Sequence, residues 1–216
     1  MNNHADKIDI AAHKAILFDL DNTLYPHNNG LWEQIRNRIE QFMREELHFT
    51  GDDISATRDR LWRTYGTTLR GLQTEFQVDM DTYLEYVHAI PLDGYIEAQP
   101  ELAQILDNLS QPKFIFTNSD GRHAKRVLEL LNVTDRFSQI IDIYALAPYC
   151  KPQTEAFQIA LDTVGQAPED CLFIDDSPAN LEKAQQLGMT TISVGQYPHD
   201  GSPHISHIQE LPDLLK

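Results

Sequence analysis

The sequence predicts an α/β protein whose doubly wound parallel sheet carries an inserted all-helical domain. A short apolar run, Ala15 to Phe18, is expected to form a buried strand. Residues 30–88 show helical spacing of apolar side chains and no strand-like segment. In the second half of the chain strand and helix patterns alternate, which is typical of a parallel sheet with helices on both faces. We therefore expect a core domain from residues 1–26 and 95–216 and a helical domain from residues 27–94.

The inserted segment is expected to fold as several helices. Its first helix is indicated by apolar residues along one face, namely Ile35, Ile39, Phe42 and Met43. Asp52 or Asp53 is the expected N-cap of a second helix, which Gly66 is expected to end. A third helix follows the turn that begins at Tyr65, and a fourth covers residues 81–88. An insert of about 60 to 65 residues lies within the usual size range of a small domain.

The second half of the chain supplies the rest of the sheet. Each expected strand is a short apolar run, at residues 113–116, 139–143, 171–174 and 190–194. The helices between them show the i, i+3, i+4, i+7 spacing, as at Ala124, Val127, Leu128 and Leu131. Ser177 is the expected N-cap and Pro178 the first residue of a helix that Gly188 ends.

Composition narrows the class of protein. The 216 residues carry a formal charge of −16, with a pI near 4.8. This acidic excess repels polyanions, so we expect no nucleic acid polymer as a partner. Cys150 and Cys171 form neither a metal-binding pair nor a disulfide framework, which fits a reducing compartment. No apolar run reaches the length of a membrane span, and the polar residues 1–9 are unlike a signal or transit peptide. We expect a cytoplasmic protein, away from membranes, that is a monomer or homodimer.

Polar side chains follow four of the expected strands. They are Asp19 and Asp21, Thr117 and Asn118, Lys151, and Asp175 and Asp176. The carboxyl ends of parallel strands share one edge of the sheet, so we expect these groups to converge. Several carboxylates suit a hard cation such as Mg²⁺, and a lysine suits phosphate. A carboxylate can also act as the nucleophile in phosphoryl transfer. Taken alone, the segment after the first strand is equally well an acidic turn, because Asp, Asn and Pro favour turns.

These residues, in this order, resemble the motifs of the haloacid dehalogenase superfamily of phosphohydrolases. The resemblance spans nearly the whole chain and rests on Asp19-Leu20-Asp21-Asn22-Thr23, Thr117-Asn118, Lys151-Pro152 and Asp175-Asp176. It implies a Rossmann-like core and makes the helical insert similar to the C1-type cap of that family. It also implies that Asp19 is the nucleophile that forms an aspartyl-phosphate. Asp21 would then protonate the leaving oxygen and afterwards activate the hydrolytic water.

The resemblance also assigns roles to the remaining groups. Thr117 and Lys151 would hold the phosphoryl group, and Thr23 and Asn118 would add substrate contacts. The implied ligands of the Mg²⁺ cofactor are Asp19, the backbone carbonyl of Asp21, Asp175 and Asp176.

The same comparison separates reaction types. Family members that remove halide lack a carboxylate two residues after the nucleophile, so the presence of Asp21 favours a phosphatase or a phosphomutase. Members that cleave phosphonates need a lysine in the cap, and residues 30–88 contain none. A phosphomutase stays open, because it differs from a phosphatase in cap closure and in the return of the phosphoryl group.

The expected substrate comes from a narrower resemblance. Residues 23–26 and 65–72 look like the pyrimidine 5'-nucleotidase branch, whose members hydrolyse UMP and CMP. Arg70 would contact the substrate phosphate or a base carbonyl, and Tyr65 would stack on a ring. The alternatives are an ordinary cap-core aromatic for Tyr65 and a solvated helix residue for Arg70. The resemblance thus implies a small phosphorylated partner, in first place a nucleoside 5'-monophosphate. Flavin, pyridoxal, glycolate or sugar phosphates stay open, as does a catalytically silent phosphate-binding protein.

Three further sets of residues have simpler interpretations. The histidines of the C-terminal loop lack ligand-like spacing and are expected at the surface: His199, His204 and His207. Trp32 and Trp62 are expected to pack on cap helices. Asn180 either orients the acidic pair or is an ordinary polar residue of a first helical turn.

Overall fold

The computed structural model describes residues 7–51 and 53–216. Asp52, one of the two candidate N-caps, and the first six residues of the polar N-terminal stretch lie outside the described residues. The strands are β1 (Ala15–Phe18), β2 (Lys113–Phe116), β3 (Gln139–Ile141), β4 (Cys171–Asp175), β5 (Thr190–Val194) and β6 (His204–Ile205). They form one parallel sheet in the order β3-β2-β1-β4-β5-β6, so the predicted doubly wound α/β fold is confirmed. Chain connections run outward from β1 on one side and from β4 on the other, which puts the topological switch point between these two strands.

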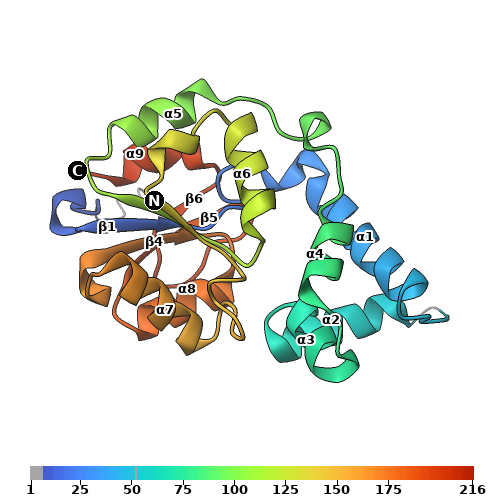
Figure 1. The fold of residues 1–216 in the computed structure, drawn as a ribbon. Coiled ribbons are helices and arrows are strands. Elements are labelled where there is room, and N and C mark those ends of the chain that lie inside the picture. The colour runs from blue at the N-terminus through green and yellow to red at the C-terminus, as the bar shows by residue number, and fades with distance from the viewer. Residues whose placement is uncertain (1–6, 52) are drawn as a thin grey trace.

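Helices cover both faces of the sheet (Figure 1). On one face lie α5 (Pro100–Asp107), α6 (Gly121–Leu130) and α9 (Leu211–Leu214), and on the other α7 (Thr154–Val164) and α8 (Pro178–Gln186). Ile16 and Phe18 of β1 pack toward the first set, whereas Ala15 and Leu17 pack toward the second. Because the strand is buried on both faces, its sequence is a continuous apolar run rather than an alternating one.

The regular secondary structure in the described part of the inserted segment is all helical. Its helices are α1 (Leu31–Glu45), α2 (Ile54–Tyr65), α3 (Thr68–Phe76) and α4 (Met80–Val87). Figure 1 shows them gathered beyond the carboxyl ends of the strands, as an inserted helical cap would lie. The predicted inner face of α1 is confirmed, since Ile35, Ile39, Phe42 and Met43 are all buried.

The main departures from the predicted strands concern β3 and β6. β3 ends at Ile141, two residues early, because the Asp142 carboxylate accepts hydrogen bonds from the N–H groups of Gly121 and Ala145 and turns the chain. β6 was not predicted, since its two residues follow a Gly/Ser/Pro segment without apolar alternation. His204 therefore lies on a strand, with its Nδ1 3.2 Å from Oγ of Ser193. Among the described helices none combines the length and hydropathy that a bilayer span requires.

Candidate active site

The polar groups that follow the strands meet at the carboxyl edge of the sheet. Asp19 follows β1, Thr117 follows β2, and Asp175 is the last residue of β4. These three strands are neighbours, so the three side chains are brought together at the topological switch point. A cavity of about 830 Å³ opens here between the sheet edge and helices α1, α2 and α4.

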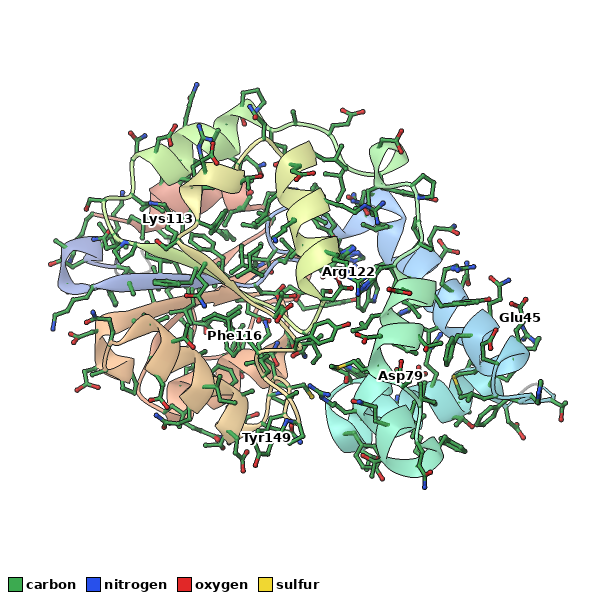
Figure 2. The ribbon with its side chains drawn as sticks, in the orientation of Figure 1. Glu45, Asp79, Lys113, Phe116, Arg122 and Tyr149 are labelled. Carbon is green, nitrogen blue, oxygen red and sulfur yellow. The ribbon has the colours of Figure 1, made fainter. Side chains whose placement is uncertain are left out.

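Lys151 reaches the same edge from the loop after β3. Its Nζ donates to Oδ1 of Asp19 and to Oδ2 of Asp175, at 2.8 Å each, and to the Phe116 carbonyl at 2.6 Å. Phe116 ends β2 on the side nearer the cap, whereas Lys113 lies at the far end (Figure 2). Burial alone would lower the pKa of Lys151, but Asp175 and Asp19 raise it above its ordinary value. The lysine is therefore a fixed positive charge between two carboxylates.

The backbone around Lys151 is held from two sides. Its N–H donates to Oδ1 of Asn118 at 2.8 Å, and Nδ2 of Asn118 donates to its carbonyl at 3.0 Å. From the cap, the turn at Gly66 packs so closely that a Cβ there would lie 2.9 Å from Sγ of Cys150 and 3.0 Å from the Lys151 carbonyl oxygen. The φ of Gly66, +87°, also favours glycine. The α2–α3 turn therefore rests directly on the lysine loop.

Three carboxylates form a compact acidic group. Asp19, Asp175 and Asp176 each bring one oxygen to within 4.8 Å of the others. Burial raises the pKa of Asp19 to about 7; Lys151 opposes this rise, and Asp175 and Asp21 add to it. Burial, together with Asp19 and Asp175, also raises the pKa of Asp176. Crowded carboxylates with such raised pKa values have the donor chemistry that a hard divalent cation requires, so this group could hold a metal.

Asp175 and Asp176 differ in the number of hydrogen bonds that their carboxylates accept. Both oxygens of Asp175 accept hydrogen bonds from Nδ2 of Asn180, and Oδ1 also accepts the Ser177 N–H at 2.7 Å. Asn180 thus orients Asp175, the first residue of the acidic pair, which supports one of the two roles considered for it. Asp176 accepts only a long bond, 3.4 Å, from Nδ2 of Asn22, whose Oδ1 is buried and has no partner among the described residues. Asp176 therefore keeps more room to bind an added ligand.

Asp21 is held by a different set of donors. Its Oδ1 accepts from the Tyr25 hydroxyl at 2.6 Å and lies 2.9 Å from Nε2 of His123, and its Oδ2 accepts from the Ser119 hydroxyl at 2.6 Å. Burial alone would raise the pKa of Asp21, but the charge and hydrogen bond of His123 and the bonds from Ser119 and Tyr25 bring it well below its ordinary range. The Asp21 carboxylate is thus held by donors that it does not share with Asp19, Asp175 or Asp176.

Sequence reasoning assigned no contact with Asp21 to Ser119, Tyr25 or His123. Each stands within six residues of a motif that was recognised, and this proximity was the available signal. Ser119 directly follows Asn118, Tyr25 follows Thr23 by two positions, and His123 lies in the first turn of α6.

The side chains expected to contact substrate differ in the hydrogen bonds that they already make. Tyr65 lines the cavity, although its hydroxyl donates to Glu75 at 3.1 Å. Thr23 donates its hydroxyl to Oδ2 of Asp19 at 3.1 Å. Oγ1 of Thr117 accepts the Ser119 N–H at 3.0 Å, which leaves the hydroxyl hydrogen available to another acceptor.

Arg70 does not take the expected place. It is 6% exposed, it is absent from the cavity lining, and its guanidinium donates to the carbonyls of Tyr149 and Ile143 at 2.8 and 2.9 Å. Tyr149 lies on the core side of the junction with the cap (Figure 2). The expectation that Arg70 contacts substrate is thus corrected: the side chain is occupied in tying α3 to the loop that leads into Lys151.

The cap side of the cavity is aromatic and basic. Its lining includes Trp32 and Arg36 of α1 and Trp62 and Arg63 of α2. The two indoles are 37% and 54% exposed, so they are not the packing residues that the sequence suggested. Neither Arg36 nor Arg63 makes a salt bridge within the described part of the chain.

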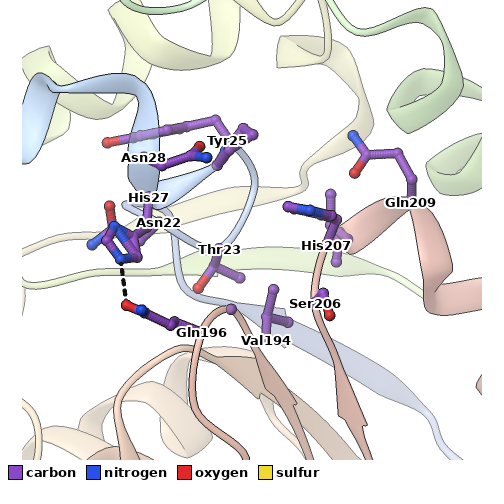
Figure 3. Close-up of a pocket in the computed structure, with 13 residues that line it drawn as sticks. Asn22, Thr23, Tyr25, His27, Asn28, Val194, Gln196, Ser206, His207 and Gln209 are labelled. Atoms are coloured by element: carbon purple, nitrogen blue, oxygen red, sulfur yellow. Dashed lines mark hydrogen bonds between the residues drawn. The ribbon is translucent and has the colours of Figure 1, made fainter.

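A second, smaller cavity of about 360 Å³ lies behind the Asp19–Tyr25 loop (Figure 3). Asn22 and Thr23 line it on one side and His207 on the other. Nε2 of His27 lies 3.0 Å from Oε1 of Gln196 across its mouth. The residues that line this cavity include histidines and amides but no carboxylate, so its chemistry differs from that of the acidic site.

Comparisons with known proteins agree with this geometry. A family model described as haloacid dehalogenase-like hydrolase matches residues 13–188. The chain is 28% identical to phosphate metabolism protein 8 of Saccharomyces cerevisiae over 195 residues, which cover 82% of this chain and 60% of that protein. It is 25% identical to N-acetylmuramic acid 6-phosphate phosphatase of Pseudomonas aeruginosa, with 94% of both chains covered. In fold it is similar to the magnesium-bound putative HAD-hydrolase YfnB of Bacillus subtilis, with a TM-score of 0.65, 18% identity, and 94% and 98% of the two chains covered.

Proposed function

We propose that this chain, which belongs to the haloacid dehalogenase-like hydrolases, is a Mg²⁺-dependent phosphatase that acts through Asp19 on pyrimidine nucleoside 5'-monophosphates. The observation that carries the proposal is the position of Lys151, whose Nζ lies 2.8 Å from Asp19 at the floor of the cavity. A buried ammonium beside a carboxylate can draw a phosphoryl group onto that carboxylate, because it offsets the negative charge of both.

In the proposed reaction an Asp19 oxygen forms a bond to phosphorus while the bond from phosphorus to the leaving oxygen breaks. In its protonated form Asp21 gives a proton to that oxygen, which departs as an alcohol, and the next step returns the proton to Asp21. Asp21 then takes a proton from a water molecule, whose oxygen attacks phosphorus and frees Asp19 as phosphate forms. The Thr117 hydroxyl and the Lys151 ammonium are the protein donors available to the other phosphoryl oxygens.

We assign the metal to Asp19, Asp176 and the backbone carbonyl of Asp21, with Asp175 as the residue that orients Lys151. The hydrogen bonds support this division, because Asp175 is fully engaged whereas Asp176 has a single long contact. When bound, Mg²⁺ would neutralise charge shared between the carboxylates and the phosphoryl oxygens.

The cap side of the cavity supports an aromatic substrate. An aromatic ring that stacks on an exposed indole removes apolar surface from water, which favours binding. Trp32, Trp62 and Tyr65 all line the same cavity, and both indoles are exposed. Arg36 and Arg63 can donate to the carbonyl groups of a pyrimidine or to the ester phosphate. The two unpaired, buried cysteines fit the reducing cytoplasm, where such metabolites occur.

A phosphatase for another small metabolite is the second candidate. It is supported by relatives named for N-acetylmuramic acid 6-phosphate and for phosphoglycolate. A phosphomutase would use the same chemistry but return the phosphoryl group. A catalytically silent binder is disfavoured, because the nucleophile, the acid, the lysine and the acidic group are all present.

Phosphate release from a panel of esters tests the proposal. The panel includes UMP, CMP, dTMP, AMP, GMP, flavin mononucleotide, pyridoxal phosphate, phosphoglycolate and sugar phosphates, each with Mg²⁺ and with chelator. We expect metal-dependent release that favours UMP and CMP. Preference for another ester would keep the chemistry and overturn the substrate, and no release from any ester would overturn both.

A further inference from the structure

Two stacked histidines join the cap to the carboxylate expected to act as the acid. His123, from the first turn of α6, is 1% exposed, and its Nε2 lies 2.9 Å from Oδ1 of Asp21. The other ring nitrogen, Nδ1, is buried and has no partner among the described residues. A buried histidine usually has its ring orientation and tautomer fixed by a hydrogen bond to the second nitrogen. Here a stacked ring, instead of a second hydrogen bond, restrains the orientation of the His123 ring.

His88 supplies the stack. It follows the last turn of α4 in the cap, and its ring lies face to face with His123, with centroids 4.3 Å apart and planes inclined by 22°. His88 also lines the cavity. It therefore contacts the space expected to hold the leaving group on one side and the partner of Asp21 on the other.

The ring of His88 is anchored to the same helical turn that carries His123. Its Nδ1 is hydrogen-bonded to Oδ2 of Asp120, and Oδ1 of Asp120 caps α6 by accepting the N–H groups of Arg122 and His123, at 2.8 and 2.9 Å. One carboxylate thus fixes the cap residue and the helix start together. The His88 ring cannot leave without releasing a bond at that turn.

Further contacts between α4 and α6 also hold the end of α4 in place. Arg126 of α6 donates to the carbonyls of His88 and Ile90, and Arg122 is paired with Glu85 of α4 at 2.7 Å. Figure 2 shows Arg122 where α6 faces α4. The end of α4 is therefore docked on the start of α6.

We propose that His123 is a positioning residue for Asp21 and that His88 makes this positioning depend on the docking of the cap. The inference rests on the proposed function of Asp21 as acid and base. With α4 docked, the stack holds the His123 ring so that Nε2 faces Asp21, and the carboxylate is directed at the leaving oxygen. With α4 undocked, the ring keeps only its bond to Asp21 and can rotate. Proton transfer then occurs only while the cap is docked, and the docked cap also limits access of water.

The test compares two leaving groups. A nucleotide or another alkyl phosphate needs a proton on its departing oxygen, whereas the phenolate of para-nitrophenyl phosphate departs without one. The parameter is kcat/KM, which covers the steps up to release of the alcohol and excludes the later attack of water. In His123→Leu we expect it to fall about 10²-fold for the alkyl ester and less than about threefold for the aryl ester, in line with the usual contribution of a positioned acid.

Two further variants sharpen the result. His123→Gln restores an N–H donor near the position of Nε2, and we expect it to recover much of the alkyl activity. His88→Leu should show the same selective loss at about tenfold, and the double variant should lose no more than His123→Leu alone, because both residues act through one carboxylate. His13→Gln, at a buried histidine before β1, should leave the ratio of the two esters unchanged.

Equal losses on both esters would overturn the inference, since they would mark a general structural defect. Unchanged alkyl activity in His123→Leu, or additive losses in the double variant, would also overturn it. Failure of the wild-type protein to hydrolyse either ester would instead refute the proposed function. The two failures are therefore distinguishable.

Discussion

Nζ of Lys151 lies 2.8 Å from Oδ1 of Asp19, and the lysine side chain is only 1% exposed. The same nitrogen is 2.8 Å from Oδ2 of Asp175, so one ammonium group holds two carboxylates that would otherwise repel each other. Stability and chemistry are linked through this contact, because the group proposed to hold phosphate also balances charge inside the folded core.

Removal of that charge should destabilise the protein. In Lys151→Met two buried carboxylates lose their partner, and we expect the free energy of unfolding to fall by about 3 to 5 kcal/mol. Urea denaturation followed by circular dichroism measures the change. Lys14→Met is the matched control, because Lys14 forms its ion pair with Asp170 at the surface, where such pairs contribute little. Equal stability of the two variants would contradict the central position given to Lys151.

Stabilisation by Mg²⁺ should grow with pH. Burial raises the pKa of Asp19 to about 7, so this carboxyl binds more protons in the folded, metal-free protein than in the unfolded chain between about pH 4 and 7, and its contribution to stability falls across that range. A cation binds the deprotonated carboxylate and removes this loss. We therefore expect the rise in Tm on adding Mg²⁺ to be small at about pH 5.5 and larger at about pH 7.5. A shift independent of pH would count against a metal on Asp19.

Arg70→Ala should affect all substrates alike. The guanidinium donates to the buried carbonyl of Ile143 and the part-buried carbonyl of Tyr149, so its loss leaves both acceptors unpaired and should cost about 2 to 3 kcal/mol of stability. Because the lysine loop follows these residues, kcat should fall by a similar factor for UMP and for a small ester such as phosphoglycolate. Steady-state kinetics with both esters checks this. A loss confined to nucleotides would restore the role in substrate binding that the sequence suggested.

Trp62→Ala should weaken the binding of nucleotides but not of small phosphate esters. The indole is 54% exposed and lines the cavity, and we expect its removal to raise KM for UMP roughly threefold to tenfold, the size of one aromatic stacking contact. KM for phosphoglycolate should not change. Phe76→Ala is the control, since Phe76 is an exposed cap aromatic outside the cavity lining. If Trp62→Ala behaves like Phe76→Ala, the cap does not bind a ring at this position.

The core could be predicted closely because its signals are local. Strands β2 and β5 have the expected bounds, since apolar runs buried on both faces have no other place in an α/β fold. Asp19, Thr117 and Asp175 could be grouped because the ends of parallel strands share one edge. The acidic group could therefore be predicted from the strand pattern alone, without knowledge of side-chain conformations.

The donors around Asp21 could not be predicted in the same way. His123 meets Asp21 through the packing of α6 on β1, and His88 comes from another segment altogether, so no spacing in the sequence pairs them. Arg70 shows the converse. A single arginine beside a glycine suggests a ligand contact, but only the position of the loop at Tyr149 determines where its guanidinium goes.

Direct detection of a phosphoryl group on Asp19 tests the central claim. The Asp21→Asn variant lacks the base that activates water, whereas para-nitrophenyl phosphate needs no acid to lose its phenolate. With Mg²⁺ we predict a burst of about one para-nitrophenolate per chain, followed by slow turnover. After an acid quench, mass spectrometry should find the phosphoryl group on the peptide that contains Asp19, and Asp19→Asn should show neither burst nor label. A phosphoryl group on another residue, or turnover by Asp19→Asn near the wild-type rate, would contradict the account.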